Sequence, residues 1–278
     1  MIDPKRLSYH PSIAGPSAVR WPESAAVAAG AGFAITDLAL EELDGLTPGE
    51  VQATLAEHGL RPGAVPLPVE FRRDEDTYRT GLADLGRRAR LAATVGVRTM
   101  YRSLPAAAEE PRDVWEPVLR RRLAECAAVL RDQGMELALE ILGPLHRRRE
   151  APHEFIWRLP DCAAFAMSVG PSVGVLVDSW HWHHGGGSTT EIADVASLIL
   201  HAHLADAPDL PPEAIRDQER VLPGDGVADV GAFLAALAAA GYGGPISLEI
   251  PGGWYASSDP TVNATDARHA AEHSLANA

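Results

Sequence analysis

The chain has 278 residues, of which 46% are hydrophobic and 22% charged, and its formal net charge is −14 at pH 7. This charge argues against a nucleic-acid partner, because binding phosphate groups requires concentrated positive charge. No apolar run approaches the roughly 18 residues that a membrane helix needs, and the first residues do not read as a signal peptide. We therefore expect no membrane partner and a cytoplasmic location.

Short apolar runs alternate with amphipathic, helix-like segments along the chain. The predicted strands cover residues 6–13, 33–40, 64–71, 97–104, 135–142, 173–179, 199–206 and 245–250, and the predicted helices cover residues 23–32, 47–58, 74–95, 111–133, 160–169, 190–198, 230–240 and 260–275. Repeated strand–helix units imply a parallel sheet, because parallel neighbours need crossover connections. Their number and total length predict an α/β fold, a single (β/α)8 TIM barrel over residues 1–278. An open doubly wound sheet fits less well, because the first turn lacks the usual glycine-rich motif.

The lysine, cysteine and arginine residues limit which roles these residue types can have. Lys5 is the only lysine and precedes the first predicted strand, so a Schiff-base lysine inside a site is not expected. Cys126 and Cys162 have no metal-type spacing and lie in helical stretches, where we expect small buried hydrophobic residues. The arginine run Arg120–Arg122 is expected to be the solvated face of a helix.

Four consecutive predicted strands finish with a ligand-type side chain, and these are Glu140, Asp178, His203 and Glu249. In a TIM barrel the active site forms at the carboxyl ends of the strands, so these side chains should meet there. Burying three carboxylates together without a partner would cost several kcal/mol, and a divalent cation removes that cost. We therefore predict one divalent metal ion bound by these four residues. An oxygen-rich set with one imidazole suits Mn²⁺ first, with Mg²⁺ or Co²⁺ as alternatives.

Several short motifs resemble, in their order and spacing, the xylose isomerase-like TIM-barrel superfamily. They are LALEI around Glu140, D-x-x-H from Asp178 to His181, HAHLAD around His203, R-x-x-P-G-x-G from Arg220 to Gly226, and ISLEI around Glu249. This superfamily includes ketose 3-epimerases, hydroxypyruvate isomerases, inosose dehydratases, dehydroshikimate dehydratases and, more distantly, endonuclease IV. Each motif is weak alone, but the resemblance spans essentially the whole chain and is fairly specific as a set.

The resemblance implies a divalent-metal-dependent isomerase or epimerase of a sugar or keto-polyol. Glu140 and Glu249 would then be metal ligands and also an acid/base pair on opposite faces of the substrate. The cation would hold the carbonyl and a neighbouring hydroxyl, and would stabilise the enediolate formed by proton transfer. The alternative is a metal-dependent dehydratase or lyase of an inosose-like or dehydroshikimate-like substrate. An abasic-site endonuclease is disfavoured by the acidic charge, and a non-catalytic barrel is the remaining alternative. Such barrels bind a small-molecule substrate and often form homodimers.

Further side chains near the strand ends are candidates for substrate contacts. His181 is expected to touch the substrate or brace a metal ligand, and is a candidate catalytic residue. Arg220 should hydrogen-bond a substrate hydroxyl or carboxylate, with a loop-bracing salt bridge as the alternative. Trp180 and Trp182 should wall the pocket. His146 stands where ketose 3-epimerases carry a further substrate-binding glutamate, which puts a simple ketohexose epimerase in doubt and suits a bulkier or acidic substrate.

The remaining histidines have less specific roles. Tyr9 and His10, at the end of the first predicted strand, either reach the substrate or only pack. His201 faces the same side of its strand as the predicted ligand two residues later, and should be an interior histidine one layer deeper. His183 and His184 are expected to be exposed loop residues, or else to line the site.

Overall fold

Parallel strands form one curled sheet at the centre of the molecule, in a computed structural model that describes residues 2–15, 19–252 and 257–278. The strands of this sheet are β1 (Leu7–Tyr9), β2 (Ile35–Thr36), β3 (Arg61–Pro62), β4 (Val65–Pro66), β5 (Thr99–Ser103), β7 (Glu136–Glu140), β9 (Val173–Asp178), β10 (Ile199–His203) and β11 (Ile246–Ser247). Their order in space is β3-β2-β1-β11-β10-β9-β7-β5-β4, and every neighbouring pair is parallel. All of these strands therefore end on the same side of the sheet.

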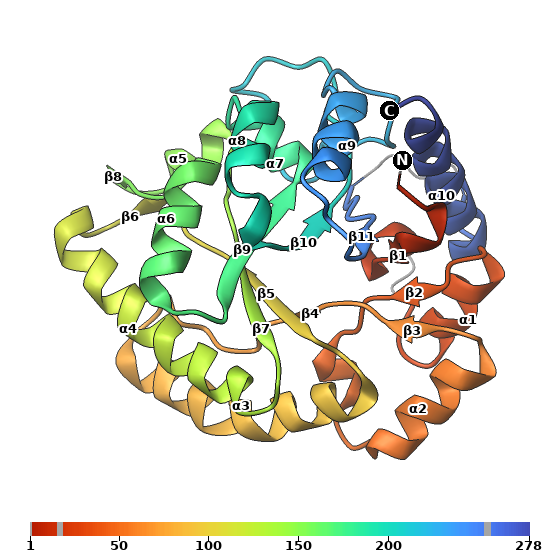
Figure 1. The fold of residues 1–278 in the computed structure, drawn as a ribbon, viewed down its shortest axis with the longest axis horizontal. Coiled ribbons are helices and arrows are strands. Elements are labelled where there is room, and N and C mark those ends of the chain that lie inside the picture. Colours follow the sequence, from red (N-terminus) through yellow and green to blue (C-terminus); the bar gives the residue numbers. More distant parts are fainter. Residues whose placement is uncertain (1, 16–18, 253–256) are drawn as a thin grey trace.

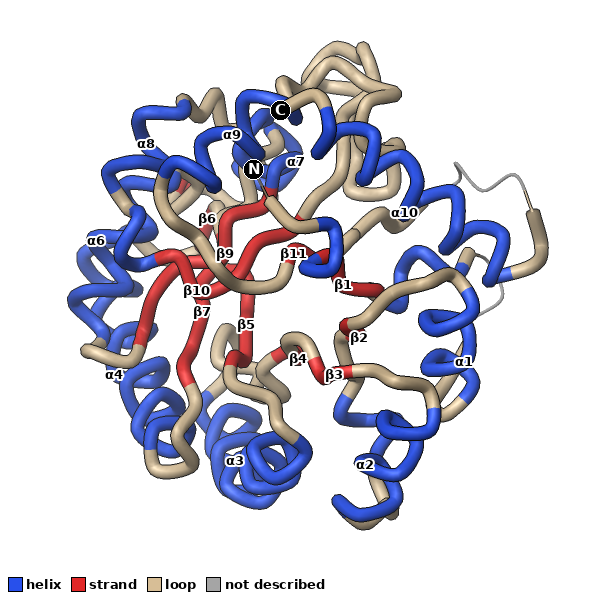
Figure 2. The backbone as a smooth tube through the Cα atoms, turned by 45° about the vertical axis from the view of Figure 1, so that its right-hand side comes forward, coloured by secondary structure: helices blue, strands red, loops and turns tan. Residues whose placement is uncertain are grey.

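The two outermost strands in this order, β3 and β4, belong to one short stretch of chain, residues 61–66. β3 pairs with β2 through Ile35 and Arg61, and β4 pairs with β5 through Val65 and Met100. This stretch joins both edges of the sheet and closes it into a barrel, as can be followed in Figure 2. When β3 and β4 are taken as one strand, the nine strands of this sheet in the described residues correspond to the eight strands of a barrel. The predicted α/β fold, a (β/α)8 TIM barrel, is confirmed.

Helices surround the barrel and connect its strands (Figures 1 and 2). The longer ones are α1 (Glu23–Gly30), α2 (Pro48–Glu57), α3 (Glu75–Val95), α4 (Arg112–Arg131), α6 (Leu159–Val169), α9 (Val230–Ala239) and α10 (Pro260–Ala276). Shorter elements are α5 (Leu145–Arg148), α7 (Ser179–His184), α8 (Thr189–Asp194), the 3-10 helices η1 (Pro4–Arg6), η2 (Pro11–Ala14), η3 (Leu40–Leu43) and η4 (Ala196–Leu198), and an antiparallel pair of β6 (Ala107–Ala108) with β8 (His153–Glu154). In the described ranges, none of these helices has the length and apolar character needed to cross a membrane.

Local signals place the helix ends close to their predicted positions. Thr47 and Glu50 form a capping box at the start of α2, and the Asp74 carboxylate accepts the N–H of Thr77 at 2.8 Å at the start of α3. Gly96 ends α3 with a φ of 107°, in the left-handed region that favours glycine. Such signals act within one turn of chain, so the sequence alone predicts these boundaries well.

The third strand differs from its prediction over residues 64–71. Val69 and Phe71 are buried, which reproduces the alternation of a strand in the sequence. Pro66 and Pro68 lack the N–H groups that a strand ladder needs, and Phe71 donates its N–H back to the carbonyl of Val69 at 3.1 Å. The chain therefore leaves the sheet after β4. The strand predicted over residues 64–71 is wrong in its bounds, because the residues in the sheet are 61–62 and 65–66.

The arginine run Arg120–Arg122 divides between two environments. The first two side chains are about two-fifths exposed and reach solvent, as predicted, but Arg122 is only 4% exposed. Its guanidinium donates to the carbonyls of Phe71 and Arg73 at 2.7 and 2.6 Å and to the carboxylate of Glu75 at 2.9 Å. Because all these partners lie just before α3 or in its first turn, Arg122 ties α4 to α3, and its assignment to a solvated face is wrong.

Candidate active site

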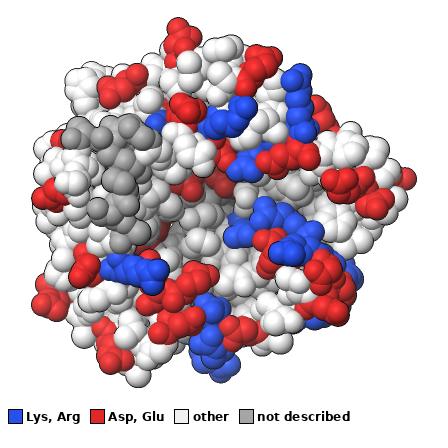
Figure 3. Space-filling view, turned by 180° about the vertical axis from the view of Figure 1, so that it is seen from behind, with Lys and Arg blue, Asp and Glu red and all other residues white. Residues whose placement is uncertain are grey.

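On β7 and β9, side chains that point into the barrel change from apolar to polar toward the ends of the strands. Ala138 of β7 and Leu176 of β9 belong to a small apolar cluster inside the barrel. Two residues further on, Glu140 and Asp178 end these strands and point to the same side, because side chains alternate along a strand. His203 ends β10 in the same way. One mouth of the barrel therefore collects polar side chains, and Figure 3 shows the surface hollowed near the middle of this face.

The four predicted metal ligands lie together at this mouth. Ligand atoms of Glu140, Asp178, His203 and Glu249 all fall within 4.8 Å of one another. His203 Nδ1 is 3.2 Å from Glu249 Oε2, 3.5 Å from Glu140 Oε1 and 3.8 Å from Asp178 Oδ2. The side chains of Asp178 and His203 are fully buried, whereas that of Glu249, just beyond β11, is 21% exposed. The arrangement leaves one side of the group open toward the hollow.

The chemistry of these donors fits a divalent cation. Three carboxylates and one imidazole form an oxygen-rich set of the kind that binds Mn²⁺ or Mg²⁺. Within the described ranges, Glu140 Oε1 is buried and has no hydrogen-bond partner. A buried carboxylate oxygen without a partner is costly, and a cation bound by this group would satisfy it. We therefore treat these four residues as a candidate metal site.

Burial and charge act differently on the groups of this site. Burial raises the pKa of Glu140 to about 7. Burial would also raise the pKa of Glu249, but the Arg220 guanidinium and the His203 imidazole hold it well below its usual value. Asp178 keeps a lowered pKa for a similar reason, with Arg220 as the main opposing charge. Burial would lower the pKa of His203, yet Glu249 and Glu140 raise it well above its usual value. Fixed positive charge thus already balances part of this acidic site.

Arg220 is the source of that fixed charge and is 4% exposed. Its Nη1 donates to Asp178 Oδ2 at 2.7 Å, and it lies 3.1 Å from Glu249 Oε2 and 3.0 Å from the Glu249 carbonyl oxygen. Its guanidinium also lies over the Trp180 ring, 4.7 Å from the centroid. The structure therefore shows the salt-bridge role for Arg220, made to two of the candidate ligands themselves, and its predicted substrate contact stays a prediction.

Asp206 explains why a glycine-rich motif follows Arg220. This buried carboxylate accepts the backbone N–H groups of Ala207, Gly224, Gly226 and Ala228 at 2.7 to 3.1 Å. A Cβ atom on Gly226 would lie 2.3 Å from the Ala207 carbonyl oxygen, so only glycine permits this close approach. Asp206, which ends the HAHLAD motif three residues after the last residue of β10, thus anchors the loop that carries Arg220.

His181 lies beside the four ligands without belonging to their group. It follows Asp178 in α7, where Asp178 Oδ1 accepts the His181 N–H at 2.8 Å as the helix cap. Its Nε2 lies 3.3 Å from Arg220 Nη2. Burial lowers the pKa of His181 to about 3, so the ring is neutral at physiological pH and accepts from Arg220. Its Nδ1 is buried and has no hydrogen-bond partner in the described part of the chain, which makes it available to a bound molecule.

The aromatic residues and neighbouring histidines of α7 have different outcomes. Trp180 is fully buried with the Arg220 guanidinium over its ring, and its predicted place in the pocket wall stays a prediction. Trp182 packs against Phe233 of α9, and its predicted place in the pocket wall is wrong. His183 and His184 belong to α7 and are half-buried, so their prediction as exposed loop residues is also wrong. The run SWHWHH forms a helix because Asp178 caps it directly at the strand end.

His10 and His146 have different surroundings. His10 Nε2 lies 3.2 Å from the Tyr101 hydroxyl and 4.0 Å from Glu249 Oε1, so this side chain is part of the mouth. His146, in α5, instead lies with its Nε2 3.3 Å from Asp217, which also pairs with Arg147. None of these partners of His146 belongs to the ligand group, so the structure does not bring His146 together with it.

Two interior side chains near the site were not singled out from the sequence. Tyr101, in β5, packs edge-on against His203 with ring centroids 5.0 Å apart. Asp37 directly follows β2 and is 4% exposed. The rule that strand ends carry the chemistry, applied to the second strand as well, would have found Asp37 in the run FAITD. His201 is an interior histidine, as predicted, with its Nε2 3.0 Å from the Ser247 hydroxyl.

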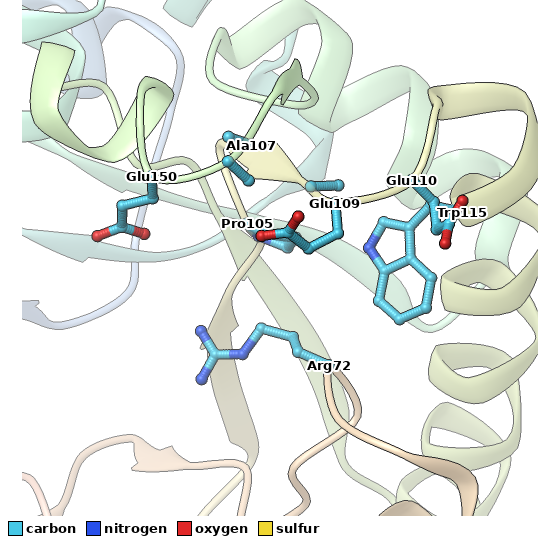
Figure 4. Close-up of a pocket in the computed structure, with 9 residues that line it drawn as sticks. Arg72, Pro105, Ala107, Glu109, Glu110, Trp115 and Glu150 are labelled. Atoms are coloured by element: carbon cyan, nitrogen blue, oxygen red, sulfur yellow. The ribbon is translucent and has the colours of Figure 1, made fainter.

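Cavities on the same face lie apart from the ligand group. One of about 300 Å³ is drawn in Figure 4, between the loops that follow β4, β5 and β7. Its charged lining is mixed, with Arg72 opposite Glu109 and Glu150 and the indole of Trp115 at one side (Figure 4). It contains none of the four candidate ligands. The ligand group is the candidate site instead, because several perturbed pKa values and an unpaired buried carboxylate oxygen occur together there.

Comparison with known proteins agrees with this geometry. A family model described as the xylose isomerase-like TIM barrel matches residues 25–276. The chain belongs to this family. A solved xylose isomerase domain protein from Alicyclobacillus acidocaldarius has a TM-score of 0.88 and 28% identity, covering 97% of this chain and 98% of that chain. The resemblance seen in the sequence motifs is confirmed.

Curated relatives of this xylose isomerase-like barrel are enzymes. An inosose isomerase from Bacillus velezensis is 28% identical over 210 residues, which cover 71% of this chain and 71% of the relative. A 3-dehydroshikimate dehydratase from Pseudomonas putida is 35% identical over 137 residues, which cover 48% of this chain but only 20% of that protein. The relatives include isomerases and dehydratases, and the expectation that this barrel is an enzyme is confirmed.

Proposed function

We propose that the chain is a divalent-metal-dependent isomerase or epimerase of a sugar or cyclic keto-polyol, with inososes as the first class to test. The observation that carries this proposal is the largely buried group of Glu140, Asp178, His203 and Glu249 at one mouth of the barrel. Similarity to an inosose isomerase over 71% of both chains supports the substrate class. Oxygen-rich ligation supports Mn²⁺ as the cation, before Mg²⁺ or Co²⁺.

The proposed reaction moves a proton at the carbon next to a carbonyl. A cation bound by the four residues would polarise that carbonyl and increase the acidity of the neighbouring carbon. Glu140 and Glu249 come from strands on different sides of His203, so their carboxylates can face the substrate from two directions. One glutamate removes the proton and the other returns it. Arg220 holds Asp178 and Glu249 in place, and His181 orients a substrate hydroxyl.

A dehydratase is the second candidate, and a specific observation favours it. The match to a 3-dehydroshikimate dehydratase has higher identity, 35%, although the chain spans only a fifth of that protein. The same proton abstraction serves both reactions, because loss of a β-hydroxyl from the resulting intermediate gives a dehydrated product.

We expect the metal-loaded protein to convert an inosose into an isomer of the same mass. Incubation with Mn²⁺ and separate inososes, or with 3-dehydroshikimate, checks this expectation when the products are first separated by chromatography, which resolves isomers, and then weighed by mass spectrometry. The metal-free protein is the matched control. A product that has lost water identifies the dehydratase instead. Absence of turnover of all these keto compounds with Mn²⁺, Mg²⁺ and Co²⁺ would contradict both candidates and indicate a non-catalytic barrel.

Substitution of His181 should impair turnover more than metal binding. His181 lies outside the ligand group, and its neutral ring has a buried nitrogen available to the substrate. We expect His181→Ala to retain the cation while kcat/KM falls by about 10- to 1,000-fold, the range for a positioned acid/base group or a partner of the ligands. Metal content and steady-state kinetics measure the two effects separately. An unchanged kcat/KM would show that His181 only packs.

A further inference from the structure

Asp37 is a buried carboxylate near the site that the proposed reaction does not use. Its Oδ1 accepts the Ser8 hydroxyl at 2.8 Å and the Ala64 N–H at 3.1 Å. Its Oδ2 is buried and has no hydrogen-bond partner among the described residues. Because an unpaired buried polar atom costs about 1–3 kcal/mol, and more when charged, this oxygen indicates a missing donor.

The space around Asp37 is kept free by a glycine. A Cβ atom on Gly63 would lie 2.1 Å from Asp37 Oδ1 and 2.9 Å from Ser8 Oγ. Any larger residue at position 63 would therefore push the carboxylate out of its place. Asp37 is therefore held in one orientation, in which Oδ1 accepts two hydrogen bonds and Oδ2 accepts none from the described residues.

His203 has the complementary unpaired atom. Its Nδ1 faces the carboxylates of the ligand group, at 3.2 Å from Glu249 and 3.5 Å from Glu140. Its Nε2 is buried and, within the part of the chain that the structure describes, has no hydrogen-bond partner. A carboxylate oxygen of Asp37 and ring nitrogens of His201 and His203 all lie within 4.8 Å of one another.

The chemistry of imidazole then identifies the donor. A neutral histidine that binds a cation through Nδ1 carries its proton on Nε2, and that N–H usually donates to a carboxylate, carbonyl or water. Two other buried carboxylate oxygens in the described ranges also have no hydrogen bond, but Glu140 Oε1 lies on the Nδ1 side and Asp217 Oδ1 lies beside His146. Asp37 Oδ2 is therefore the acceptor available to His203 Nε2.

We propose that Asp37 is a positioning residue, which accepts the Nε2–H of His203 and so aims Nδ1 at the cation. The hydrogen bond forms either directly, after a small movement of the His203 ring and the Asp37 carboxylate toward each other, or through one bridging water. This inference rests on the proposed metal site. It adds to that site a residue that directly follows β2, a strand separated by β1 and β11 from the strand that carries His203.

The test compares Asp37→Asn with Ser8→Ala. Asparagine keeps the size of the side chain, and its single oxygen must stay on the Ala64 N–H, which turns an NH₂ group toward the His203 N–H. We expect the affinity for Mn²⁺, measured by competition with a chelator, to fall by about 10- to 100-fold. Ser8→Ala removes a donor to Oδ1 but leaves Oδ2 in place, so its affinity should change much less. The thermal midpoint of each metal-free variant controls for folding.

NMR spectroscopy detects the proposed hydrogen bond between His203 and Asp37 directly in the wild-type protein. In protein labelled with ¹⁵N-histidine, the Nε2 of His203 should carry a slowly exchanging, low-field proton, both without metal and with diamagnetic Mg²⁺, because paramagnetic Mn²⁺ would broaden the signal. Its absence from the wild type, or its persistence unchanged in Asp37→Asn, would overturn the proposal. Undiminished Mn²⁺ affinity of Asp37→Asn would also overturn the proposal. So would a second equivalent of Mn²⁺ that binds the wild type and is lost in this variant, because Asp37 would then be a metal ligand. A wild-type protein that binds no metal but shows the proton would overturn only the proposed function.

Discussion

Asp178→Asn and His203→Gln should each abolish tight binding of the divalent cation, whereas His201→Gln should retain it. Wild-type protein is expected to bind one equivalent per chain. Removing a direct ligand should weaken binding by more than about 100-fold, beyond the loss expected for an outer partner. Asparagine at position 178 keeps the size of the side chain and one of the two oxygens that cap α7 and receive Arg220, and Glu249 still pairs with the buried guanidinium. Elemental analysis after dialysis, together with chelator competition, measures the effect.

His201 is an informative control because it lies on the same strand and the same face as His203. It is equally buried, and one of its ring nitrogens lies within 4.8 Å of Asp37 and His203. If that alternative group bound the cation, His201→Gln would lose it and Asp178→Asn would retain it. Full occupancy in both Asp178→Asn and His203→Gln would exclude the proposed ligand group.

Turnover in heavy water should place deuterium on the carbon next to the substrate carbonyl. The proposed reaction passes through a carbanion-like state, and the glutamate that holds the abstracted proton can exchange it with solvent before returning it. Glu140→Gln and Glu249→Gln keep the size of the side chain and one oxygen, but the amide cannot accept the proton. Each substitution should therefore lower kcat by about 100- to 10,000-fold. Mass spectrometry and NMR of recovered substrate and product detect the label.

The two variants should differ in the label as well as in the rate. If Glu140 and Glu249 serve opposite faces, the variant that retains the initial base still exchanges the substrate proton but does not complete turnover. The other variant exchanges no label, and the comparison identifies the base. Because both glutamates are also candidate ligands, metal content is measured first in each variant. Product free of deuterium under conditions without wash-out indicates a hydride shift and rejects the paired-glutamate mechanism.

The barrel could be predicted from the hydrophobic periodicity of the sequence, because apolar strand-like runs alternate regularly with amphipathic helix-like segments. Strands such as β9 are buried on both faces and read as continuous apolar runs, and caps such as Asp74 mark the helix starts. The third strand was placed wrongly, since two prolines and a turn interrupt a stretch that still alternates like a strand. Arg122 was assigned to the solvent because its partners, the carbonyls before α3, become neighbours only in the folded chain.

The ligand group was predictable because one geometric rule selects strand ends, and four of those ends carry ligand-type side chains. The surroundings of that group were not predictable in the same way. Arg220 reaches Asp178 from a loop 42 residues away, and the loop is anchored by Asp206 rather than by any local periodicity. Asp37 is a single carboxylate after the second strand, so in the sequence it stands apart from the four consecutive strand ends that define the ligand group.

The salt bridges of Arg220 have a consequence for how the cation is acquired. A guanidinium that stays charged at all physiological pH values lies against Asp178 and Glu249, so these acidic groups have a counter-charge built into the polypeptide. We therefore expect the barrel to fold before any ion arrives, unlike small zinc domains, which are unfolded without their metal. Occupancy of the proposed site would then be an exchange equilibrium with the surroundings. The ion that binds would depend on the relative supply of Mn²⁺, Mg²⁺ and Co²⁺ as well as on the ligands themselves.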